Sequence, residues 1–200
     1  MASSFECEVR FTIKDIKVFK RRLRELKARL LYPYAFTDYY YHPVNEKWNP
    51  LQKNLRIREW QKPKRPSTIY FVKNEIVKIG GIKFKRALYP EGKTPLFAGN
   101  TEACKSILID LGFKPWVTVK KEKALFWNVH RYGFKTIAEY IKGLGWTGEL
   151  EFEGKNPKRA MTEIKKALSI LGIQPGLVSF KPISVLFAEK VDLRRIKQAL

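Results

Sequence analysis

The feature that most constrains this chain is an alternation of charged and apolar side chains along several short segments. In FECEVRF, at residues 5–11, Glu6, Glu8 and Arg10 occupy every second position. The same alternation recurs in NLRIREW, at 54–60. Because an extended strand directs successive side chains to opposite faces, each segment has one charged face and one apolar face. The pattern therefore predicts β-strands that are apolar on one side only.

Acidic and basic faces fall on different strands. TGELEFEG, at 147–154, alternates glutamates with apolar residues, whereas NLRIREW places Arg56 and Arg58 on one face. An open antiparallel sheet wetted on one side gives such alternation. A closed barrel gives it too and leaves no exposed edges. An ionic interior requires water and a charged ligand, because unpaired buried charges are strongly destabilising. Both arrangements fit the residues alone.

The composition is that of one folded domain spanning 1–200. The chain is 44% hydrophobic and 14% aromatic, which argues against disorder. No apolar segment approaches the roughly 20 residues that a membrane span needs. The first residues lack the basic and then apolar pattern of a secretory signal. We therefore expect a cytoplasmic protein, in which Cys7 and Cys104 stay reduced.

The net charge of +21, from 40 Lys and Arg against 19 Asp and Glu, predicts an anionic partner. Nucleic acid, polyphosphate and nucleotides all qualify. Apolar residues at helical spacing in 14–30 indicate an amphipathic helix, and its other face is strongly basic. That face is either solvated or a nucleic-acid surface, and the sequence leaves both open.

The order of elements predicts an α+β fold with about seven or eight mostly antiparallel strands. Predicted strands cover 5–13, 36–42, 54–60, 67–79, 82–89, 115–133 and 147–154, and predicted helices cover 14–30, 100–112, 156–172 and 183–199. Glycines 80 and 81 fit a hairpin turn between two of the strands. Asn156, Pro157 and Gly172 are typical of a helix start and stop.

Several motifs, taken in order, resemble the CYTH domain superfamily, the triphosphate tunnel metalloenzymes. This superfamily includes class IV adenylyl cyclases and thiamine triphosphatases. ECEVR, at 6–10, is similar to its opening ExExK strand, with Arg10 in place of lysine. LRIR, at 55–58, matches its LRxR strand, and Lys73 fits a lysine usual on the next strand.

The resemblance continues toward the C-terminus and covers roughly 5–153, with the helices of 156–200 following it. KEK, at 121–123, is similar to a KxR pair of the family, with Lys123 in place of arginine. The family pattern of an acid, then GLG, then ExE appears as Glu139, 143–145 and 149–151. The resemblance implies a closed, roughly eight-stranded antiparallel barrel, or tunnel, with helices packed on the outside.

The resemblance also implies a site inside the barrel. The metal ligands it implies, for Mg²⁺ or Mn²⁺, are Glu6, Glu8, Glu139, Glu149 and Glu151. The phosphate-binding residues it implies are Arg10, Arg56, Arg58, Lys73, Lys121 and Lys123. Lys85, on the predicted strand at 82–89, is an additional candidate. Carboxylates suit a hard cation, and guanidinium and ammonium groups suit phosphate oxygens. Lys73 is the predicted general base, with a tyrosine of 39–41 as the alternative; His42 and His130 are predicted to be structural.

Two functions follow from these observations. The first is a divalent-metal-dependent enzyme acting on tripolyphosphate, thiamine triphosphate or a nucleoside triphosphate, more a phosphohydrolase than an adenylyl cyclase. The second is a non-enzymatic protein that binds RNA or another polyanion through its basic helices at 14–30 and 183–199. The two differ in whether the strand carboxylates are required, since counterion-driven binding does not need them.

Overall fold

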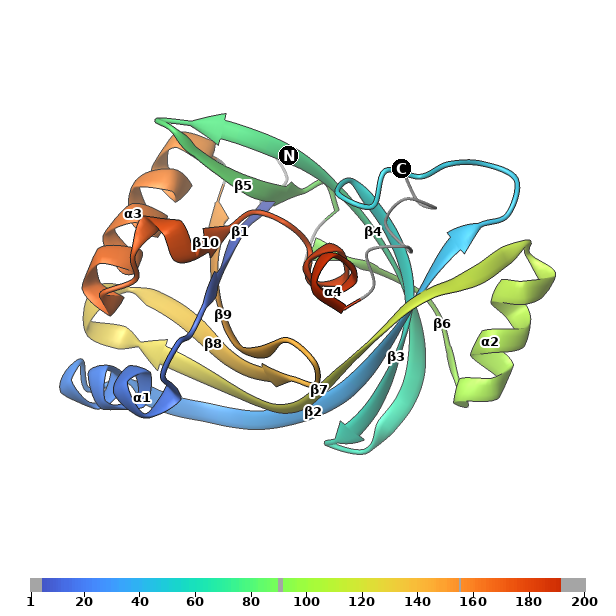
Figure 1. Ribbon diagram of the computed structural model, residues 1–200, viewed down its shortest axis with the longest axis horizontal. Helices are drawn as coiled ribbons and strands as arrows, with labels where there is room; N and C mark the ends of the chain where they lie inside the picture. Colours follow the sequence, from blue (N-terminus) through green and yellow to red (C-terminus); the bar gives the residue numbers. More distant parts are fainter. Residues whose placement is uncertain (1–4, 90–91, 155, 192–200) are drawn as a thin grey trace.

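The protein is a closed antiparallel β-barrel, described by a computed structural model over residues 5–89, 92–154 and 156–191 (Figure 1). The barrel strands are β1 (Phe5–Thr12), β2 (Arg29–Pro43), β3 (Lys53–Lys62), β4 (Arg65–Ile79), β5 (Ile82–Ala87), β7 (Phe113–Val129), β8 (Phe134–Ile141) and β9 (Gly145–Gly154). They pair in the order β1, β5, β4, β3, β2, β7, β8, β9, and β9 pairs again with β1. The predicted α+β barrel is confirmed.

Two short strands and four α-helices complete the described part of the chain. They are β6 (Thr94–Gly99), β10 (Val178–Ser179), α1 (Ile16–Glu25), α2 (Thr101–Asp110), α3 (Pro157–Leu171) and α4 (Ile183–Val191), with 3₁₀ turns at His130–Tyr132 and Pro175–Leu177. β6 pairs with β4, and β10 pairs with β1. Within the described ranges, no helix has the length and apolarity needed to cross a membrane.

The pairing of β1 with β9 closes the barrel. Its register places the charged faces of the two strands on the same side. Glu8 lies opposite Glu151, and Arg10 lies opposite Glu149. Residues that oppose each other across an antiparallel pair point to the same face. Because the apolar residues of both strands face the other way, all four charged side chains point into the barrel.

The apolar faces of these strands form the outer wall of the barrel, which α1 and α3 cover. Cys7, Val9 and Leu150 are buried in one cluster with Leu23 of α1 and Ile164 of α3. α2 covers the other side of the barrel, where β3 lies (Figure 1). This arrangement removes the outward apolar face from water and leaves the barrel interior to the charged residues.

α1 is shorter than the predicted helix at 14–30. Asp15 caps its start by accepting hydrogen bonds from the backbone N–H groups of Lys17 and Val18. The helix ends at Glu25 with Leu26 as its C-cap, and Lys27 follows with a φ of 53°, which no α-helix accommodates. From Arg29 the chain is already in β2, because pairing with β7 takes precedence over the apolar periodicity.

The strand prediction omitted β6 and β8, and it gave β2 less than half of its length. The predicted helix at 183–199 begins at the right residue, but its described part is apolar and not basic. Ile183, Val185 and Ala188 of α4 are buried against Trp116 of β7 and Ile141 of β8. Residues 192–199 of that prediction lie outside the described residues.

α4 differs from the other helices because it packs at one end of the barrel. It lies within the ring of strands in Figure 1. Its Lys190 Nζ donates to the carbonyl of Leu144, in the turn between β8 and β9, at 3.1 Å. Pro182 and Ile183, where α4 begins, line the interior cavity. α4 therefore covers the end of the barrel at which β8 and β9 meet.

Tight packing between β1 and β9 gives a test of this closure. Phe11 is buried opposite Gly148, and a Cβ at position 148 would lie 2.1 Å from two of its ring carbons. We expect Gly148→Ala to lower the free energy of unfolding by about 1–3 kcal/mol through overpacking, measured by denaturant titration. Gly176→Ala is the control, since its Cβ would meet no atom within 4 Å. Equal stability of the two variants would contradict the packing.

Candidate functional site

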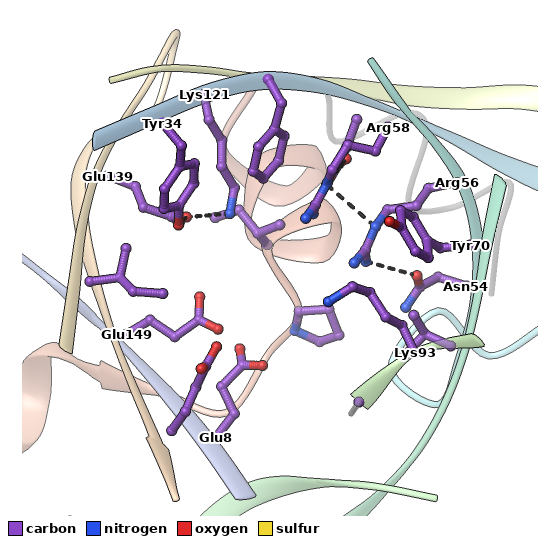
Figure 2. Close-up of a pocket in the computed structure, with 18 of the residues that line it drawn as sticks. Glu8, Tyr34, Asn54, Arg56, Arg58, Tyr70, Lys93, Lys121, Glu139 and Glu149 are labelled. Atoms are coloured by element: carbon purple, nitrogen blue, oxygen red, sulfur yellow. Dashed lines mark hydrogen bonds and ion pairs between the residues drawn. The ribbon is translucent and has the colours of Figure 1, made fainter. Parts of the chain in front are cut away.

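The candidate site is a cavity of about 400 Å³ inside the barrel. Its described charged lining residues are Glu8, Arg10, Asp38, Arg56, Arg58, Arg65, Lys85, Lys93, Lys121, Glu139, Glu149 and Glu151. Figure 2 shows Glu8 and Glu149 on one side of the cavity and Arg56, Arg58 and Lys93 on the other. Carboxylates therefore predominate on one side of the cavity and cationic groups on the other.

Three carboxylates of the acidic side form a plausible cation site by their geometry. Glu8 of β1 and Glu149 and Glu151 of β9 each place a carboxylate oxygen within 4.8 Å of the other two. Glu8 and Glu149 are buried, and Glu151 is half-buried. An all-oxygen, anionic donor set suits a hard divalent ion such as Mg²⁺ or Mn²⁺. These residues therefore fit the metal that the sequence resemblance implies.

Arg10 and Lys85 supply counter-charges to the acidic side. The Arg10 guanidinium contacts Glu149 and lies 3.2 Å from both Glu8 and Glu139. The Lys85 ammonium lies 2.6 Å from Glu8. Burial alone would raise the pKa of Glu8, but Lys85 and Arg10 outweigh it and lower that pKa to about 2. Burial, together with the neighbouring Glu8 and Glu139 charges, raises the pKa of Glu149.

Glu139 of β8 is engaged apart from the three-carboxylate set. Its Oε1 accepts hydrogen bonds from Lys121 Nζ at 2.5 Å and from the Tyr34 hydroxyl at 2.8 Å. Burial opposes ionisation of Glu139, yet Lys121 and Arg10 lower its pKa. Glu139 therefore links the acidic side of the cavity to the cationic side through Lys121.

Asp38 of β2 organises the basic side. Its two oxygens accept hydrogen bonds from Arg58 Nε and Nη2, both at 2.8 Å, and its Oδ2 lies 3.4 Å from Arg56 Nε. Arg56 also donates to the Asn54 side chain at 3.3 Å. Burial would raise the pKa of Asp38, but Arg58 and Arg56 lower it to about 2. One buried carboxylate thus fixes both guanidinium groups toward the cavity.

Most of the residues predicted from the sequence line this cavity. They are Glu8, Arg10, Arg56, Arg58, Lys85, Lys121, Glu139, Glu149 and Glu151. Arg10 lies among the carboxylates, whereas it was expected to contact phosphate. Glu6 belongs to β1 and pairs with Glu153, but its side chain lies outside the described residues.

The structure does not bring Lys73 to the cavity, which corrects its predicted roles as general base and phosphate ligand. Val72 and Asn74 line the cavity on either side of it in β4. Strand alternation then turns Lys73 outward, and its side chain is exposed. The tyrosine alternative for the base is not favoured either, because burial raises the pKa of Tyr40, the member of 39–41 that lines the cavity.

Lys123 also lies away from the cavity, although simple alternation places it on the same face as Lys121. The pairing of β7 with β8 shifts register between these two lysines, as a β-bulge does. Beyond the bulge the inward parity changes, so that Phe126 lines the cavity and Lys123 is exposed. His42 is buried outside the cavity lining, against Trp116 at 4.4 Å between ring centres.

Sequence reasoning missed Asp38, Tyr34, Asn54 and Lys93 as lining residues. Asp38 lay within the predicted strand at 36–42 but was passed over among its tyrosines. Asp38 could have been found from the alternation of β2, because Tyr34, Phe36, Asp38 and Tyr40 occupy every second position and all line the cavity. Lys93 follows β5 in a connecting segment, where no periodicity points to it.

The buried Asp38 gives a prediction for pH-dependent stability. Its pKa is about 2 in the folded protein and 3.8 in a model peptide, so its contribution is complete above pH 3.8. That contribution, about 2 kcal/mol, is lost as the pH falls from about 4 to about 2. We expect Asp38→Asn to be much less stable than the parent at pH 7, with the gap narrowing below pH 4.

Denaturant titration at pH 7, 4 and 2.5 measures this gap. Asp110→Asn, which removes an exposed carboxylate at the end of α2, is the matched control and should leave stability nearly unchanged at each pH. A gap between the parent and Asp38→Asn that is as wide at pH 2.5 as at pH 7 would contradict the ion-pair account.

Comparison with known proteins places the fold. Neither protein-family models nor curated sequences give a match. A solved structure from Pyrococcus horikoshii is similar, with a TM-score of 0.71 and 19% identity over 92% of this chain and 99% of that one. A conserved hypothetical protein from Pyrococcus furiosus has a TM-score of 0.70 and 22% identity over 90% and 99%.

A "putative adenylate cyclase" from Vibrio parahaemolyticus has a TM-score of 0.67 and 14% identity, over 93% of this chain and 99% of that one. A Hippeastrum protein described as a "putative adenylyl cyclase" with a dominant triphosphatase activity has a TM-score of 0.59 and 11% identity over 93% and 95%. The chain therefore shares the fold of these proteins over more than nine tenths of its length.

Proposed function

We propose that this protein is a divalent-metal-dependent enzyme that hydrolyses triphosphate-containing substrates inside its barrel. The observation that supports the proposal best is the separation of charge within one cavity. A three-carboxylate oxygen cluster lies on one side, and two arginines held by Asp38 lie on the other. A polyphosphate carrying a divalent cation has the complementary arrangement of charge.

Glu8, Glu149 and Glu151 would hold the cation. A bound Mg²⁺ or Mn²⁺ would supply Lewis-acid polarisation of a phosphoryl oxygen and neutralise developing charge. The cavity is suited to this because Arg10 and Lys85 already offset part of the acidic charge. The repulsion between the three carboxylates is therefore low enough for them to stay close before a cation binds.

Arg56, Arg58 and Lys121 would bind the phosphate oxygens. Two donors of the Arg58 guanidinium bind Asp38, which fixes the plane of the group. The directions of its remaining N–H groups are therefore fixed as well. The described lining has seven Lys and Arg and five Asp and Glu, a formal excess of two positive charges. That excess and one divalent cation together balance a fully ionised triphosphate ester.

Hydrolysis requires little covalent chemistry from the chain. A water oxygen forms a bond to the terminal phosphorus, the bond from that phosphorus to the bridging oxygen breaks, and orthophosphate and a diphosphate result. Such transfer depends on positioning and charge stabilisation, which the fixed arginines and lysine provide. The Hippeastrum neighbour, with its dominant triphosphatase activity, supports hydrolysis over cyclisation.

The polyanion-binding alternative is not favoured by a specific observation. The basic side chains of α1 lie on the outside of the barrel, and two of them pair with Glu25. Arg22 also donates to the carbonyl of Ile170 at 2.9 Å, so it helps to attach α1 to the end of α3. These contacts indicate a structural and solvated role for this helix.

The proposal is tested by phosphate release from tripolyphosphate, thiamine triphosphate and ATP, with Mg²⁺, with Mn²⁺ and with a chelator. We expect turnover that the chelator abolishes. Glu8→Gln and Glu151→Gln should lower kcat/KM by about 100-fold or more, because a catalytic cation supplies several kcal/mol of charge stabilisation. Calorimetric titration of Mn²⁺ into each variant checks that metal binding is what has been lost.

Lys73→Ala and Lys123→Ala are the matched controls, because both remove a strand cation that lies outside the cavity. Each should retain kcat/KM within about twofold, as expected for surface substitutions. Turnover that persists in chelator, or no turnover of any triphosphate, would exclude the proposed function.

A further inference from the structure

The end of the cavity opposite α4 is built from aromatic rings. Tyr32, Tyr34 and Phe36 of β2, Trp60 of β3 and Phe126 of β7 all line it, and we call these five residues the aromatic mouth. Ring centres lie 5.3 Å apart for Tyr32 and Phe126, 5.5 Å for Tyr34 and Phe36, and 5.1 Å for Phe36 and Trp60. The rings therefore form one continuous surface across three strands.

The aromatic mouth adjoins the phosphate-binding side of the cavity. The Arg58 guanidinium lies 3.6 Å from the centre of the Phe36 ring and 5.5 Å from that of Trp60. Lys121 Nζ lies 4.9 Å from the centre of Phe36. A phosphate bound by Arg58 would therefore place the group attached to it beside these rings.

The outer part of the aromatic mouth is accessible. Tyr32 is 52% exposed, which is unusual for a large aromatic side chain that lines a cavity. Trp60 is half-buried, whereas Phe36 is buried and serves the packing of the wall. Proteins bind nucleobases by stacking them on exposed aromatic side chains beside a cationic groove. Tyr34 and Phe126 are also half-buried, but the Tyr34 hydroxyl binds Glu139 and the Phe126 ring packs against Tyr32. We therefore assign the stacking to Tyr32 and Trp60.

The charged group beside the outer ring, Trp60, is a cation. The Arg65 guanidinium is exposed and lies 5.3 Å from the centre of the Trp60 ring. Lys93 lies further along the cavity, with its Nζ 5.6 Å from the centre of Tyr70, which pairs with Arg56. A neutral purine or pyrimidine would stack on the rings and on the guanidinium plane. A positively charged ring, such as a thiazolium, would be attracted by the rings but repelled by Arg58 and Arg65 beside them, so the neutral base is favoured.

We infer that the aromatic mouth is a nucleobase subsite, and that the preferred substrates are nucleoside triphosphates bound with the base at the mouth. This inference rests on the proposed function and narrows its substrate class. The triphosphate extends from the mouth past Arg58 and Arg56 toward the carboxylates of β1 and β9. Tyr32 and Trp60 determine specificity and take no part in the bond-breaking step.

The test compares kcat/KM for ATP, thiamine triphosphate and tripolyphosphate in the parent and in Trp60→Leu and Tyr32→Ser. We expect the parent to prefer ATP to both other substrates. Each variant should lower kcat/KM for ATP by about 10-fold, as loss of one stacking partner does, and leave tripolyphosphate within about twofold. Tyr140→Ser is the control, because Tyr140 is 38% exposed and lies outside the cavity lining. Thermal unfolding confirms that each variant is folded.

The outcomes separate this inference from the function on which it rests. Equal losses for ATP and tripolyphosphate in Trp60→Leu, or a parent that prefers thiamine triphosphate, would overturn the subsite while leaving the hydrolase in place. If no triphosphate is hydrolysed, the function fails, and calorimetric binding of ATP and tripolyphosphate with Mg²⁺ decides the subsite. A loss of affinity for ATP alone in Trp60→Leu would then support it, and unchanged affinity for ATP would overturn it.

Discussion

The whole structure depends on one constraint, which is that charges inside a closed barrel must be paired or hydrated. An isolated buried charge destabilises a fold by several kcal/mol. This barrel meets the constraint with two networks, in which Arg10 contacts three glutamates and Asp38 contacts two arginines. Helices cover the apolar exterior of the barrel, and the charged faces of the strands can therefore point inward. Fold and candidate site are thus two results of the same alternation.

The two networks differ in what a ligand would do to them. Asp38 is 1% exposed and holds Arg56 and Arg58 from behind, so phosphate can bind to them without breaking those contacts. Arg10 instead lies among the carboxylates that form the candidate cation site. An arginine spans several carboxylates with its planar set of donors, which a lysine cannot do. The identity of residue 10 as arginine therefore determines how the acidic side is held together.

The charged face of each strand could be predicted because alternation is a local property of a strand. The closed barrel was instead predicted from the resemblance, since the residues alone also fit an open sheet. Glu8, Arg56, Arg58 and Glu149 were located by alternation together with the motifs of the resemblance, without knowledge of which strands pair. Lys123 was misplaced because a bulge in β7 reverses parity within the strand, and a bulge leaves no periodic signal. Lys73 was misplaced because the prediction followed the family motif, whereas strand alternation directs Val72 and Asn74, and not Lys73, into the cavity. The fixed pair of Asp38 and Arg58 depends on the register of β2 with β3, which a single sequence does not reveal.

The position of α4 has a consequence for the order of events. A barrel that is covered at one end is a blind channel, in which substrate would enter and products would leave through the same open end. A substrate seated with its larger portion at the open end would confine whatever is cleaved from its far tip. In the proposed hydrolysis, the fragment formed at depth would then leave after the larger one, and departure of the larger fragment would limit the rate of turnover.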